Sequence, residues 1–99
     1  MKFAAFEKSL KNASPPAEFS DALKALWYEK KGGWEKAHEY AQEDDSKAGS
    51  WVHAYLHRKE GDVSNARYWY SIAGEKFPSV SLDAEWEAMV RVFLRGMDE

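Results

Sequence analysis

Apolar residues recur at helical spacing through most of the chain, and no useful stretch alternates apolar and polar positions as a half-buried strand would. Leu23, Leu26 and Trp27 give the i, i+3, i+4 pattern, and the stem of Lys30 extends the same face. A longer amphipathic stripe near the C-terminus comprises Leu82, Trp86, Met89, Val90, Phe93 and Leu94. The pattern predicts an all-α fold, with helices near 3–12, 19–31, 34–43, 48–60, 63–76 and 82–96.

Proline and glycine separate the predicted helices. Pro15-Pro16 ends the first one, because proline lacks an N–H group and restrains the residue before it. Gly32-Gly33 and Gly61 each follow a basic last turn, as is common at helix C-termini. Asp62 and Ser81 are the expected N-caps of the helices that follow them. The short connections predict antiparallel neighbours.

Aligning Gly32 with Gly61 reveals an internal repeat of about 29 residues, a period typical of stacked helical hairpins. The alignment also pairs Ala25 with Ala54, small residues that let two helix backbones approach. We predict a single helical-repeat domain over residues 1–99. Its parts are an N-terminal helix, antiparallel hairpins at about 19–43 and 48–76, and a capping helix at about 82–96 that covers the open end of the second hairpin.

The second copy of the repeat resembles a tetratricopeptide or Sel1-like repeat through Ala54, His57, Gly61, Ala66, Tyr70, Ala73 and Pro78. The strings WVHAYLHRKEGD and NARYWYSIAG are also similar to a group of short bacterial proteins of uncharacterised function. These resemblances imply helical hairpins and bring no activity with them. In tetratricopeptide-like folds the first helix of each hairpin lines a concave, peptide-binding groove.

Composition excludes several classes of function. The net charge is −3 and no stripe of Lys or Arg exists, so nucleic-acid binding is not expected. The chain has no cysteine, which excludes disulfides and thiolate metal sites. No apolar run approaches the roughly 20 residues that span a bilayer, and the first residues do not form a signal-peptide core, so we expect a cytoplasmic protein.

The leading functional prediction is a small non-enzymatic interaction module. Aromatic and basic side chains follow one another along the first helix of the second hairpin, and such anchors are typical of binding hot spots. The candidate partner face comprises Trp51, Tyr55, Arg58 and Lys59, with Leu26 and Lys30 at matching positions of the first hairpin. The expected occupant is a protein or peptide. The alternative is that a second copy of the chain buries this face in a structural homo-oligomer.

A second alternative is a metal-binding protein or metal-dependent enzyme. His53 and His57 lie four residues apart and share a helix face, and the repeat register places His38 opposite them. Three imidazoles are enough ligands for a zinc ion. Against this, both positions on the helix are packing slots of the repeat, where a histidine can simply hydrogen-bond to a carbonyl, a tyrosine or a carboxylate.

Catalytic and cofactor signals are otherwise absent from the sequence. The residues between His53 and His57 do not form an HExxH motif, and Gly32-Gly33 has no phosphate-binding context. We therefore predict no catalytic residues and no cofactor. Glu85 and its acidic neighbours are interpreted as the charged outer face of the last helix.

Overall fold

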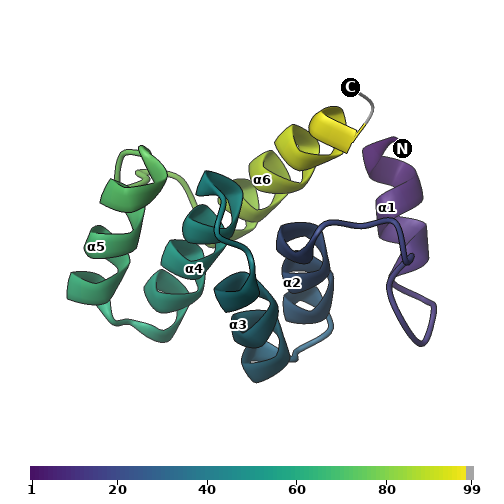
Figure 1. The fold of residues 1–99 in the computed structure, drawn as a ribbon, viewed down its shortest axis with the longest axis horizontal. Helices are drawn as coiled ribbons and strands as arrows, with labels where there is room; N and C mark the ends of the chain where they lie inside the picture. The colour runs from purple at the N-terminus through teal and green to yellow at the C-terminus, as the bar shows by residue number, and fades with distance from the viewer. Residues whose placement is uncertain (98–99) are drawn as a thin grey trace.

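The computed structural model describes residues 1–97, which form six helices and no strand (Figure 1). The helices are α1 (Phe3–Ser9), α2 (Asp21–Lys30), α3 (Trp34–Glu43), α4 (Lys47–Glu60), α5 (Val63–Ala73) and α6 (Leu82–Met97). The all-α prediction is confirmed, and each predicted helix has its counterpart. The fifth helix ends earlier than predicted, because Gly74 adopts the left-handed conformation (φ 75°) directly after Ala73.

Helix ends follow the side-chain signals in the sequence. The Asp62 carboxylate accepts a hydrogen bond from the Asn65 backbone N–H, and the Ser81 hydroxyl accepts one from the Ala84 N–H. Gly61 ends α4 with φ 90°, a conformation that favours glycine. Both N-cap predictions are therefore confirmed.

Two helical hairpins, α2–α3 and α4–α5, stand side by side, and α3 packs against α4 (Figure 1). Only residues 44–46 connect the two hairpins. Gly49, in the first turn of α4, is buried, and a Cβ atom there would lie 2.1 Å from the Asp44 carbonyl oxygen. Glycine thus permits a close approach that sets α3 against α4.

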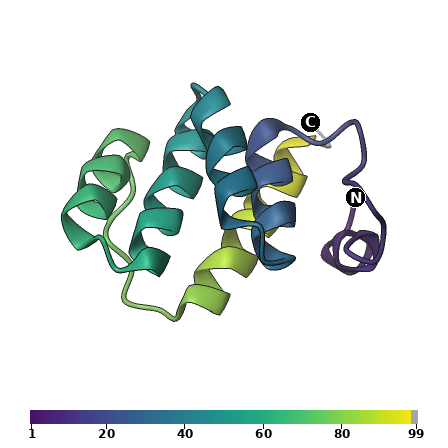
Figure 2. The same cartoon turned by 90° about the horizontal axis from the view of Figure 1, so that it is seen from below.

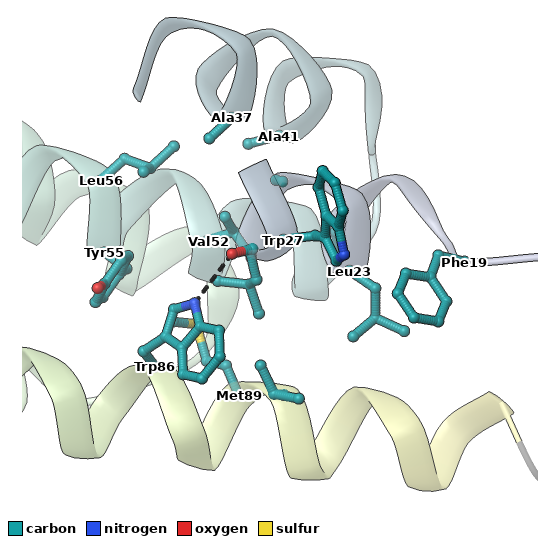
Figure 3. Close-up of a cluster of buried hydrophobic side chains, with 14 of the residues drawn as sticks. Phe19, Leu23, Trp27, Ala37, Ala41, Val52, Tyr55, Leu56, Trp86 and Met89 are labelled. Atoms are coloured by element: carbon teal, nitrogen blue, oxygen red, sulfur yellow. Dashed lines mark hydrogen bonds between the residues drawn. The ribbon is translucent and has the colours of Figure 1, made fainter. Parts of the chain in front are cut away.

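The last helix lies elsewhere than predicted. It packs across α2, α4 and α1, and does not cap the outer face of α5 (Figure 2). The Trp86 indole N–H donates to the Leu26 carbonyl (3.1 Å), which ties α6 to α2 at the centre of the core (Figure 3). The outer face of α5 stays open, with Tyr68 and Ile72 exposed.

The core follows the repeat. Small residues at the predicted packing positions are buried, including Ala25, Ala37, Ala54 and Ala66. Large apolar side chains of α2, α4 and α6 fill the space between these helices (Figure 3). Among the described helices, none is long and apolar enough to cross a lipid bilayer.

Candidate metal centre

Three histidines meet at the boundary between the two hairpins. His38 comes from α3, while His53 and His57 lie one turn apart on α4. One ring nitrogen from each residue lies within 4.8 Å of the others, and His38 Nε2 is 2.9 Å from His53 Nε2. The close packing of α3 on α4 brings all three imidazoles together, as the register of the repeat allowed.

Burial favours the neutral form of two of these rings. It lowers the pKa of His53 from 6.5 to about 4, with a further contribution from the neighbouring His38 and His57. Burial also lowers the pKa of His38, and His57 adds to the shift. The 2.9 Å contact between the two Nε2 atoms then joins an N–H donor to a lone pair. A neutral imidazole is the form that binds metal ions.

Glu60 orients the third ring. Its carboxylate Oε2 lies 2.5 Å from His57 Nδ1, one turn further along α4. In a neutral His57 ring this bond places the proton on Nδ1 and the lone pair on Nε2, the arrangement found where a carboxylate supports a metal-ligating histidine. Sequence reasoning did not single out Glu60, although its i+3 spacing from His57 is a readable signal.

Two tryptophans enclose the cluster. Trp34 of α3 stacks on His38, with ring centroids 5.0 Å apart, and Trp69 of α5 stacks on His53 at 4.0 Å. The Trp34 indole N–H donates to the Leu56 carbonyl (3.1 Å), which holds that ring in place. These contacts restrict the orientation of the imidazoles before any ion binds.

Solvent reaches the cluster. His38 is only half-buried, whereas His53 and His57 are buried. His53 and Trp69 also border a cavity of about 410 Å³, whose wall includes Asp44 and Asp45.

A second potential ligand group shares His57 with Glu60 and Asp62. Both carboxylates already have local roles: Glu60 bonds to His57, and Asp62 caps α5 through the Asn65 N–H. Both are exposed. We therefore interpret Glu60 as a support for His57, and the three imidazoles as the site itself.

The predicted partner face lies against α6. Leu26 and Tyr55 are buried. Trp51 Nε1 donates to Glu85 Oε2 (3.1 Å), and Arg58 pairs with Glu85 Oε1 at 2.8 Å. A partner that used the whole face would therefore have to displace α6.

The two lysines of the predicted face also have partners within the chain. Lys59 pairs with Glu29, a buried carboxylate of α2. The Lys30 ammonium lies 4.6 Å from the centroid of the Trp86 ring, a cation–π contact with α6. These side chains hold helices together in this structure, and the role of the face in binding a partner stays a prediction.

Trp51 differs from the rest of the predicted face because it borders an open groove. This groove is largely apolar, measures about 600 Å³ and is also lined by Val92, Phe93 and Met97 of α6. The Trp51 and Phe93 rings meet edge to face with centroids 5.8 Å apart.

Glu85 is not on the charged outer face, as the sequence suggested. Its side chain is 3% exposed and accepts hydrogen bonds from Tyr70 Oη (2.7 Å), Trp51 Nε1 and Arg58 Nη1. Burial, together with the bond to Glu85, raises the pKa of Tyr70. We call these four side chains the Glu85 cluster.

No function can be transferred to this chain from a known protein, so its function is inferred from the sites described above. The resemblance to tetratricopeptide-like repeats stays a prediction, and the helical hairpins are compatible with it. No protein-family model, curated protein or solved structure significantly matches the chain.

Proposed function

We propose that this protein binds a divalent transition-metal ion through His38, His53 and His57. The observation that carries the proposal is the convergence of three imidazole nitrogens, from two helices, within 4.8 Å. A set of neutral nitrogen ligands suits Zn²⁺, Cu²⁺, Ni²⁺ or Co²⁺. It does not suit Mg²⁺ or Ca²⁺, which prefer oxygen ligands.

Hydrogen bonding supports a ligand role over simple packing. Within residues 1–97, each of the three rings has one nitrogen in a hydrogen bond: His38 and His53 through Nε2, and His57 through Nδ1. The second nitrogen of each ring has no protein partner there. Among the described residues, no buried side-chain nitrogen or oxygen lacks a hydrogen-bond partner, so these second nitrogens reach solvent and are accessible to an ion.

The test is a titration of metal-free protein, made without a histidine tag, with Zn²⁺ in a calorimeter. The chain has three histidines in all, and each belongs to the cluster. We expect one ion per chain, lost in H38A and in H53A, with circular dichroism confirming that both variants stay helical. The matched control is E39Q, which removes an exposed charge from α3 and should bind as the parent does. Binding that is substoichiometric, or unchanged in a folded H53A variant, would overturn the proposal.

We also propose an interaction role for the groove beside Trp51. Its lining is largely apolar although it includes Lys47 and Glu75, and Val92 is 40% exposed, so a bulky apolar side chain from a peptide or protein partner would fit there. This keeps one anchor of the predicted partner face and replaces the buried remainder with residues of α6.

The interaction role is tested with V92D, which places a charge in the groove, against V80D, which changes an exposed valine outside it. Light scattering on the parent protein decides first whether the occupant is a second copy of the chain. We expect V92D to abolish the association that the parent protein shows, either with a second copy or with a partner purified on the parent, and V80D to retain it. Equal retention by both variants would contradict the proposal.

A further inference from the structure

The three-histidine site offers an ion fewer ligands than a closed site requires. Structural zinc sites have four protein ligands, whereas sites with three keep a position for water or another exogenous ligand. We propose that an ion bound by His38, His53 and His57 keeps one exchangeable coordination position, which accepts small monodentate ligands. This inference rests on the proposed metal binding and concerns what the bound ion can do.

The side chains packed on the cluster cannot complete the coordination sphere. The rings stacked on His38 and His53 are those of Trp34 and Trp69. An indole nitrogen carries a proton and has no lone pair to give to a metal ion. Trp34 and Trp69 therefore shape the site without binding the ion.

The two carboxylates that group with His57 already have partners. Glu60 bonds to His57 Nδ1 on the side of the ring away from its free lone pair, and Asp62 caps α5. In residues 1–97, no fourth His, Cys, Asp or Glu joins the three histidines in one group of mutually close ligand atoms. The remaining ligand must then come from solution.

A small molecule has a route to the ion. His38 is half-buried, so one ligand ring meets solvent, and His53 borders the cavity of about 410 Å³. A single water occupies about 30 Å³ of liquid volume, so the cavity has room for water and for a small anion. The site thus combines partly shielded histidine ligands with a side that solvent and small molecules can reach.

The experiment loads the full chain with one equivalent of Cu²⁺ and then titrates azide. An exchangeable position predicts a new azide-to-copper charge-transfer band that saturates with azide, and an altered copper EPR spectrum. Equilibrium dialysis at the end checks that one Cu²⁺ per chain remains bound. The Zn²⁺-loaded protein is the matched control, because a filled d shell gives no such band.

The possible outcomes separate the two proposals. If no stoichiometric copper binds, the proposed function fails, and this inference fails with it. If one Cu²⁺ binds tightly and azide leaves both spectra unchanged, metal binding stands and the exchangeable position is refuted. A saturable band with copper retained supports both.

Discussion

Helix α4 carries two largely buried polar clusters on different sides, and they are built on opposite principles. The Glu85 cluster, towards α6, brings three donors to one carboxylate, with Arg58 supplying the opposite charge. The histidine cluster, towards α3, brings together three groups of the same kind, each a weak base. The first is complete within the chain, whereas in the second each ring keeps one nitrogen that has no hydrogen-bond partner within residues 1–97.

The difference indicates what each cluster is for. A complete network of donors and acceptors rigidifies a core and fixes the position of one helix against others. Like groups held together gain little from one another, and here burial and proximity lower the pKa of His38 and His53. We therefore assign the Glu85 cluster to the fold and the histidine cluster to a ligand.

The largest expected effect is on the Glu85 cluster. E85A removes the carboxylate that pairs with Arg58 and leaves the hydroxyl of Tyr70 without its acceptor. Removing one member of a buried ion pair typically costs about 3–5 kcal/mol, so we expect a loss of that order in the free energy of unfolding, measured with urea.

The control for that variant is E87A on the same helix. Glu87 is exposed and pairs with Arg91 at i+4, so its removal should cost less than about 0.5 kcal/mol. Zinc affinity of the folded E85A protein should remain that of the parent. Equal destabilisation by the two variants would refute the structural role of Glu85.

The second-largest expected effect is that of low pH on the histidine cluster. Since the fold lowers the pKa of His53 from 6.5 to about 4, the unfolded chain binds a proton in this window that the folded chain does not. Stability of the metal-free protein therefore falls as the pH falls. His53 alone should remove roughly 2–3 kcal/mol between pH 7 and pH 4.5, measured by urea unfolding at each pH.

The comparison variant is H53Q, which cannot titrate. All other titratable groups are common to both proteins, so the difference between the two curves isolates His53. We expect the H53Q curve to be flatter across this window. Superimposable slopes would mean that His53 titrates normally in the folded protein.

The smallest expected effect is on metal affinity through Glu60. E60A removes the acceptor of His57 Nδ1 without touching a ligand atom. Loss of such a support typically weakens metal binding by about 10–100-fold, and calorimetry should show this with an unchanged stoichiometry of one. E39A, which removes an exposed glutamate of α3, serves as the control. A melting temperature that falls as far as the affinity does would indicate a purely structural role for Glu60.

Local chemistry made much of the fold predictable. Gly61 and Asp62 predict the turn between α4 and α5, and alanines at matching repeat positions indicate where helices contact one another. The repeat register also placed His38 opposite the pair on α4. These signals work because they depend on neighbours along the chain or on a period.

The packing position of α6 and the burial of Glu85 could not be predicted from such local signals. An amphipathic stripe shows which face of a helix is buried, and does not show against what. Glu85 finds its partners 15, 27 and 34 residues away, at Tyr70, Arg58 and Trp51. In the sequence it is one of several acidic residues near a helix N-terminus, where exposure is the usual outcome.

X-ray absorption of the zinc-loaded protein tests the central claim most directly. We expect three imidazole nitrogens at about 2.0–2.1 Å from the ion, with the outer-ring scattering typical of histidine, and one further oxygen ligand from solvent. Zinc surrounded mainly by oxygen, or by fewer than three imidazoles, would contradict the assignment of His38, His53 and His57 as its ligands.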